Sequence, residues 1–162
     1  MKKNSKLRFI LPFFLVCSLL SYCQNQKTEK REFVKSFFED IFIKEEPLEQ
    51  ISKEYRYKGS KIKSEDEAIE MFKSYITYLK TTKKHLLKKG VAFKIDHYND
   101  CSIKDLWIFE KKERKNIFVV SVEGEIVTYV LLKKNKIFSF LYFRKGSEST
   151  AYFIPYYAKQ EF

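Results

Sequence analysis

The sequence predicts an α+β fold in which N-terminal helices pack on one face of a curved antiparallel sheet. The first half of the chain carries apolar residues at three- and four-residue steps, which is the spacing of amphipathic helices. From residue 91 onward, apolar and polar residues alternate, which is typical of strands. A run of helices followed by a run of strands indicates an α+β layout rather than repeated βαβ units.

The first 22 residues have the order of a secretory signal peptide. Residues 1–8 are basic, residues 9–22 are apolar without a charge, and polar residues follow at once. A membrane-spanning helix needs about 20 apolar residues, so this run is short for a span. Pro12 within the run also argues against a spanning helix.

The end of this segment, Leu20-Ser21-Tyr22-Cys23, resembles the lipobox of bacterial lipoproteins, although Tyr22 stands where a small residue is usual. The resemblance implies that Cys23 becomes the first mature residue and carries acyl chains such as palmitate. It also implies a lipid-anchored protein of the cell envelope that faces the periplasm or the exterior. Gln24 resembles the pattern sorted to an outer membrane in Gram-negative bacteria. The alternative is an ordinary cleaved signal with a passive cysteine.

The expected organisation follows from this signal. Residues 1–22 form the signal peptide, residues 23–30 a lipidated polar tether, residues 31–157 a single α+β domain, and residues 158–162 a frayed tail. The length of 162 residues suits one domain, and 16 Phe and 11 Tyr supply material for its core. The net charge of +11 is expected on a solvated, lysine-rich surface, with contact to anionic lipid as the alternative.

Three helices are expected in the first half of the domain. The first spans about 29–45 and the second about 47–54, because Pro47 interrupts the pattern, and an extended stretch follows at 55–62. Ser64 and Glu67 form a capping box that opens the third helix. That helix is expected to continue to Gly90, with four lysines favouring its C-terminal dipole, namely Lys83, Lys84, Lys88 and Lys89.

The second half is expected to form an antiparallel meander. Glu123-Gly124 indicates a turn or a bulge, and the segment 133–136 has the composition of a tight turn. The alternating or apolar runs between the turns predict strands at 91–98, 106–109, 117–122, 126–132, 137–143 and 150–155.

This element order resembles the nuclear transport factor 2-like fold, also known from ketosteroid isomerases and polyketide cyclases. The resemblance covers about residues 29–155 and includes the ending "KKNKIFSFLYF". It implies a cone in which helices close a bent sheet around a pocket. A cystatin-like arrangement of a helix on a sheet is the alternative.

His97 is the candidate catalytic residue, because it continues the apolar face formed by Phe93 and Ile95. Enzymes of the fold that the chain resembles use an acid or base at the pocket wall. A buried, hydrogen-bonded histidine without catalytic function is the alternative interpretation. His97, Trp107 and Tyr75 are the candidate residues for lining a ligand pocket.

No metal or cofactor is expected. Cys17 leaves with the signal and Cys23 carries lipid, so Cys101 remains alone, and Cys101, His85 and His97 lack the spacing of a metal site. The sequence has no glycine-rich phosphate loop or metalloprotease motif. A nucleic-acid partner is not expected in an exported protein.

These observations leave three functional hypotheses. The leading one is a non-enzymatic binding module at the envelope, with a small apolar ligand or a protein as its partner. The second is an enzyme of the ketosteroid-isomerase-like fold that uses His97. The third is an immunity or inhibitor lipoprotein that neutralises a toxin.

Overall fold

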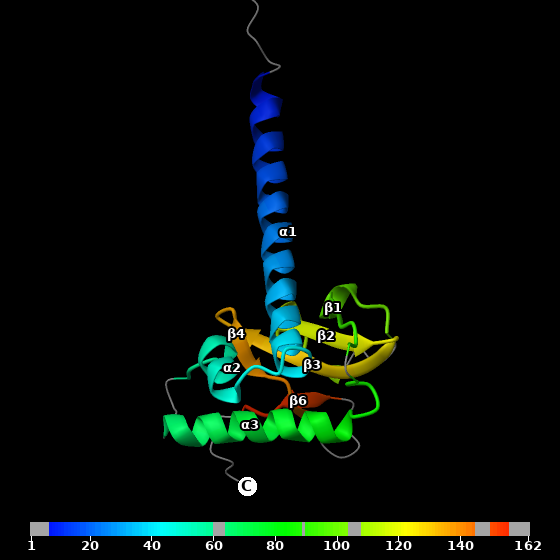
Figure 1. Cartoon of the computed structure of the whole chain (residues 1–162). Coiled ribbons are helices and arrows are strands. Elements are labelled where there is room, and N and C mark those ends of the chain that lie inside the picture. Colours follow the sequence, from blue (N-terminus) through cyan, green and yellow to red (C-terminus); the bar gives the residue numbers. More distant parts are fainter. Residues whose placement is uncertain (1–6, 60–63, 89, 104–107, 145–149, 156–162) are drawn as a thin grey trace, which may run out of the picture.

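Three helices cover one face of a four-stranded antiparallel sheet, and a two-stranded sheet lies on its other face (Figure 1). This computed structural model describes residues 7–59, 64–88, 90–103, 108–144 and 150–155, with side chains from residue 25 onward. The predicted α+β fold is confirmed. The arrangement is consistent with a nuclear transport factor 2-like cone.

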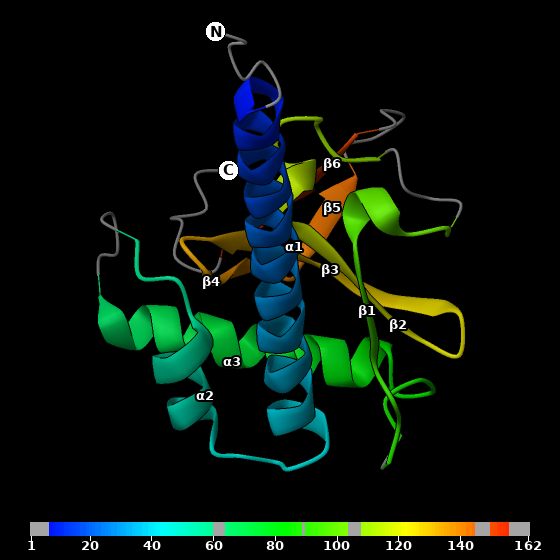
Figure 2. The same cartoon turned by 90° about the horizontal axis from the view of Figure 1, so that it is seen from above.

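Helix α1 spans Leu7–Phe42 and is much longer than expected. Its N-terminal part stands out from the domain, and its C-terminal part crosses the sheet beside α2 and β1 (Figures 1 and 2). The expected start of this helix near residue 29 was wrong, because the preceding residues from Leu7 onward are helical as well. The segment "QNQKTEKRE" contains no Gly or Pro and is rich in good helix formers, which allows the helix to continue.

Helices α2 (Leu48–Tyr55) and α3 (Glu65–Thr82) confirm the second predicted helix and the capping box. The Ser64 hydroxyl accepts a hydrogen bond from the Glu67 backbone N–H at 3.4 Å. The expected continuation of α3 to Gly90 was wrong. The chain turns at Lys83 instead, and this turn brings Leu86 into the core.

The larger sheet has the strand order β1-β2-β3-β4, so each strand pairs with its neighbour in the sequence. Glu123 and Gly124 have φ angles of 51° and 86°, and Lys134 and Asn135 have φ angles of 50° and 55°. Two successive positive φ angles are the geometry of two-residue hairpin turns, so both predicted turns are confirmed. The four strands are Lys94–His97 (β1), Ile117–Val122 (β2), Glu125–Lys133 (β3) and Lys136–Ser139 (β4).

Several strand predictions differ from the structure. The strand expected at 91–98 is shorter, because residues 91–93 are outside β1 and Tyr98 begins a 3₁₀ turn. The run 137–143 is divided between β4 and β5 (Tyr142–Arg144), and β5 pairs with β6 (Ala151–Phe153) in the smaller sheet. The strand expected at 106–109 lies partly outside the described residues, and Ile108 and Phe109 are not in a strand. Both side chains are nevertheless buried against the outer face of the larger sheet.

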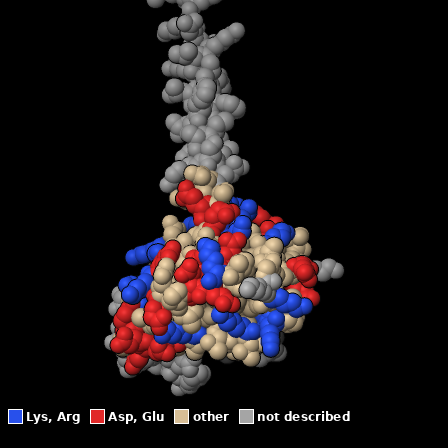
Figure 3. All heavy atoms as spheres, in the orientation of Figure 1, with Lys and Arg blue, Asp and Glu red and all other residues tan. Residues whose placement is uncertain are grey.

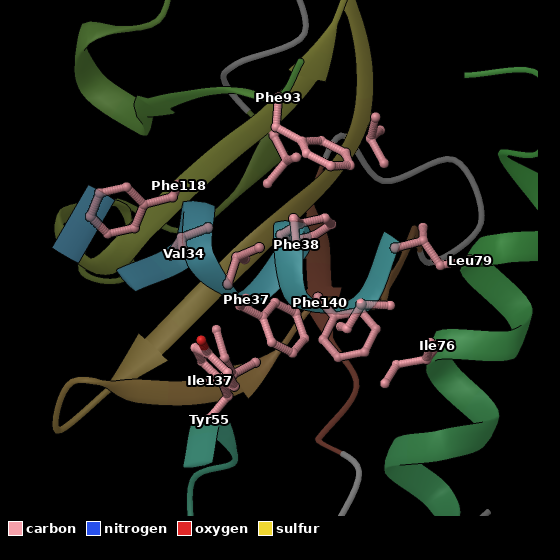
Figure 4. Close-up of a cluster of buried hydrophobic side chains, with 14 of the residues drawn as sticks. Val34, Phe37, Phe38, Tyr55, Ile76, Leu79, Phe93, Phe118, Ile137 and Phe140 are labelled. Carbon is pink, nitrogen blue, oxygen red and sulfur yellow. The ribbon is translucent and has the colours of Figure 1, made fainter. Parts of the chain in front are cut away.

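The larger sheet contributes to two hydrophobic clusters, one on each face. Along β2, Phe118, Val120 and Val122 point toward the helices, whereas Ile117 and Val119 point to the other face. This alternation explains why every residue of β2 is buried. Figure 4 shows the helix-side cluster, in which aromatic side chains of α1, the sheet and the chain after β4 pack together.

Candidate functional site

The proposed anchor residue, Cys23, lies on the same helix that enters the core. The backbone of Cys23 is within α1, while its side chain is outside the described part. Val34 is the first fully buried residue of α1 that the structure describes. At about 1.5 Å per residue, the eleven residue steps from Cys23 to Val34 span about 16 Å of helix. A group attached to Cys23 would therefore be close to the domain and joined to it by the continuous helix α1.

Two loops flank α1 where it leaves the domain. The β3–β4 turn lies on one side, where Gln26, Glu29, Lys30, Phe33 and Asn135 line a hollow of about 210 Å³. The segment after β1 lies on another side, because Asp100 and the ammonium of Lys27 form an ion pair at 3.4 Å. The ammonium of Lys136 also lies 5.5 Å from the ring centroid of Phe33. The polar residues at 26–30 are thus in contact with the domain.

His97 is buried on the helix side of the sheet, as the alternation predicted. Its Nδ1 accepts a hydrogen bond from the Asn99 backbone N–H at 3.3 Å, and its Nε2 lies 3.1 Å from the carbonyl oxygen of Lys115. Its ring meets the ring of Phe118 edge to face. With Nδ1 accepting and Nε2 donating, both ring nitrogens of a neutral imidazole are occupied by the backbone.

The other two candidate pocket residues are not brought together with His97. Tyr75 is buried on α3 and packs edge to face on Phe140, and burial raises the pKa of its hydroxyl to about 12. Among the described residues, no hydrogen-bond partner meets this hydroxyl. Trp107 lies outside the described residues.

Among the residues that the structure describes, aromatic side chains pack together in the helix-side cluster. The rings of Phe37, Phe72 and Phe140 have centroids 5.5 to 5.9 Å apart, and all three side chains are fully buried. Besides the hollow beside α1, two others open at the surface, with volumes of about 250 and 180 Å³. Neither His97 nor Tyr75 lines any of these three hollows.

Asp40 is at the centre of a buried polar contact that the sequence pattern did not reveal. It accepts hydrogen bonds from Lys44 at 2.6 Å and from the hydroxyl of Tyr55. Burial by itself raises the pKa of Asp40, but these hydrogen bonds and the charge of Lys44 bring it below the usual value. The contact joins α1 to α2.

Arg56 makes a second buried polar contact. Its Nε donates to the hydroxyl of Ser52 at 3.0 Å, and its Nη2 pairs with the carboxylate of Glu65. This contact joins the end of α2 to the start of α3. Charged residues near helix ends were visible in the sequence, but nothing local indicated which partners the fold would bring to them.

Acidic and basic side chains alternate over the face of the domain seen in Figure 3. In the part of the chain that the structure describes, no group of three His, Cys, Asp or Glu side chains is placed to hold a metal ion. Within the same ranges, no helix has an apolar stretch long enough to cross a bilayer. No family model, curated protein or solved structure matches this chain.

Proposed function

We propose that this chain is a lipid-anchored protein of the bacterial cell envelope that binds a protein partner and does not catalyse a reaction. The observation that carries the proposal is the continuity of α1, which runs through Cys23 and into the core as one helix. An acylated Cys23 would hold the domain directly at the membrane surface, because several acyl chains anchor a protein firmly.

A protein partner is favoured over a small apolar ligand by the packing of the domain. The helix-side core is occupied by Phe37, Phe72 and Phe140, where a ligand in a cone would have to lie. Aromatic side chains are available on the surface instead, and Tyr78 and Phe143 are about half exposed. Tyrosine and phenylalanine are enriched in protein interfaces. The immunity or inhibitor hypothesis is one form of this proposal, since a toxin is a protein partner.

The environment of His97 argues against the enzyme hypothesis. A general acid or base must reach the proton that it transfers, directly or through one water. The side chain of His97 is buried, and backbone groups of Asn99 and Lys115 occupy its two nitrogens. A histidine in this position serves the fold by joining β1 to the segment before β2.

The anchor is tested by growing the bacterial host with an alkyne-bearing fatty acid and detecting the label on the purified protein. We expect label on the wild-type chain and on Cys17→Ala, and none on Cys23→Ala. Cys17→Ala is the matched control because it removes a cysteine from the same apolar run. Equal labelling of Cys23→Ala and the wild type would overturn the assignment of Cys23.

Partner binding is tested by cross-linking in intact cells, followed by mass spectrometry of the purified adducts. We expect a reproducible adduct with one envelope or toxin protein, and we expect it to be lost when Tyr78 and Phe143 are both changed to serine. The exposed Tyr152 changed to serine alone provides a milder comparison. Turnover of a small molecule by the purified protein, abolished by His97→Ala without unfolding, would contradict a non-enzymatic role.

A further inference from the structure

Three segments of the chain meet where α1 leaves the domain, and together they carry more basic than acidic residues. We define the α1 rim as residues 26–32 of α1, 98–100 after β1, and 133–136 of the β3–β4 turn. Lys27 forms an ion pair with Asp100, and Lys30 lines the same hollow as Asn135. These contacts place the three segments at the same level along the axis of α1. We propose that the α1 rim is a docking surface for anionic phospholipid headgroups.

The position of the rim relative to the anchor carries the first part of this inference, which rests on the proposed acylation of Cys23. Along the helix axis, Lys27 and Lys30 lie about 6 and 11 Å from Cys23. Each polar headgroup layer of a bilayer is about 5–8 Å thick. A helix anchored at Cys23 therefore brings this level of the domain into the headgroups or to their edge.

The charge of the rim carries the second part. It contains six basic residues and three acidic ones, a net charge of +3, and the acidic ones are Glu29, Glu32 and Asp100. Three of the basic residues are in the β3–β4 turn, where Lys133, Lys134 and Lys136 follow one another with only Asn135 between them. Glu29 lines the same hollow as Asn135 and offsets part of this charge. Basic residues near an anionic leaflet bind it electrostatically.

Lys134 is the best reporter of this surface. It is exposed, and it occupies the first of the two positive-φ positions of the turn. By contrast, Lys133 lies 5.2 Å from the centroid of the Phe138 ring, and Lys136 donates to the carbonyl oxygen of Glu54, so both have contacts within the fold. Lys84 is a matched control, because it is also exposed but follows α3, which lies across the end of the domain opposite the emerging helix (Figure 1).

The test uses the mature protein extracted from host membranes and placed in lipid nanodiscs. One set of discs contains only phosphatidylcholine, and the other contains about one-third phosphatidylglycerol, which gives a negative surface. An amine-reactive reagent labels lysines, and mass spectrometry of the peptides gives the rate at Lys134 and at Lys84. The intact mass of the same sample is measured first and reports acylation of Cys23 independently.

We expect Lys134 to be labelled about fivefold more slowly in the anionic discs, which corresponds to the contribution of one lysine at such a surface. Lys84 should be labelled at the same rate in both discs. Raising the salt to about 1 M, where the Debye length is about 3 Å, should remove most of the difference at Lys134. The variant Lys134→Glu should reduce the protection of Lys30, whereas Lys84→Glu should not.

Equal labelling of Lys134 in both discs, with acyl chains present on Cys23, would overturn the rim proposal and leave the proposed function standing. Protection of Lys84 rather than Lys134 would overturn it as well, since the opposite end of the domain would then face the lipid. An intact mass without acyl chains would contradict the proposed function, and the rim proposal would fall with it.

Discussion

The imidazole of His97 shows how a buried polar side chain can be fully occupied by the backbone around it. Removing it in His97→Ala leaves the Asn99 N–H and the Lys115 carbonyl without their partner and opens a space beside Phe118. We expect the free energy of unfolding to fall by about 2–4 kcal/mol, from lost hydrogen bonds and lost packing together. Urea denaturation followed by circular dichroism measures this change.

The exposed His85 provides the control for that measurement. We expect His85→Ala to change the free energy of unfolding by no more than about 0.5 kcal/mol, because substitutions at exposed positions usually have effects of this size or smaller. If His97→Ala were as stable as His85→Ala, the structural role assigned to His97 would be wrong.

Asp40 gives a prediction about pH. Its pKa in the folded protein lies below the ordinary value of 3.8, because hydrogen bonds from Lys44 and Tyr55 outweigh the effect of burial. A carboxylate whose pKa is lower in the folded than in the unfolded protein stabilises the fold when the pH is above its pKa in the unfolded protein. This stabilisation is lost as the pH falls through its pKa in the folded protein. We expect Asp40→Asn to lower the free energy of unfolding by about 1–3 kcal/mol at pH 7.

The difference between the wild type and Asp40→Asn should shrink as the pH falls below 3.8, and thermal denaturation across that range measures it. The exposed Asp66→Asn is a control, although its place in the first turn of α3 allows a small loss from the helix dipole. A difference for Asp40→Asn that stays constant into acid would mean that the charge of Asp40 does not stabilise the fold.

For single residues, the sequence predicts which side chains are buried better than it predicts their hydrogen-bond partners. Alternation along the strand placed His97 on the apolar face, and the structure confirms it. The contact between Asp40 and Tyr55 crosses 15 residues and joins two helices, so no local pattern could indicate it. Partners of buried polar groups depend on packing between elements, which a single sequence does not specify.

Helix α3 depends on its N-terminal cap. The hydroxyl of Ser64 accepts from the Glu67 N–H, one of the donors that a helix leaves unpaired in its first turn. We expect Ser64→Ala to lower the free energy of unfolding by about 0.5–2 kcal/mol, measured by urea denaturation. Ser74→Ala, on the exposed face of the same helix, should be neutral or slightly stabilising. Equal effects of the two substitutions would count against the cap.

The elements with local chemical signals were predicted correctly, and those shaped by distant contacts were not. The capping box of α3 and the two hairpin turns each depend on a few residues that are adjacent in the sequence. The end of α3 was misplaced because Leu86 turns back into the core before Gly90 is reached. The predicted strand after residue 136 breaks because the hydroxyl of Ser139 accepts from the Leu141 N–H and donates to the Ile154 carbonyl.

The run around Ile108 and Phe109 shows a related limit. Its apolar residues suggested a strand buried on both sides, but Phe109 instead stacks on Phe153 with ring centroids 4.6 Å apart. A short apolar segment can be buried in a strand or in a packed loop, and periodicity does not distinguish the two.

At the scale of the whole molecule, the larger sheet is shared by the two hydrophobic clusters. We therefore expect one cooperative unfolding transition for the whole domain. Phe140→Leu in the helix-side cluster and Phe109→Leu in the other cluster should each lower the free energy of unfolding of that transition by about 1–3 kcal/mol. Calorimetry measures this change. Two transitions, each sensitive to only one substitution, would contradict a single domain.

In the function that we propose, the long first helix links the lipid anchor to the domain. In the mature chain that we propose, α1 starts at the lipid anchor and ends against the helix-side face of the larger sheet. One helix then joins the membrane to the core. In that proposal the end of the domain near the anchor faces lipid, and the exposed part of α3 is left available for a protein partner. This proposed orientation depends on acylation of Cys23 and on the continuity of α1.

The proposed lipid anchor is tested most directly by the intact mass of the protein extracted from membranes of its host. We expect a mature chain that begins at Cys23 and carries the mass of a diacylglycerol group, with or without a third acyl chain. A chain that begins at another residue, or one that begins at Cys23 without acyl chains, would contradict the lipid-anchored function proposed here.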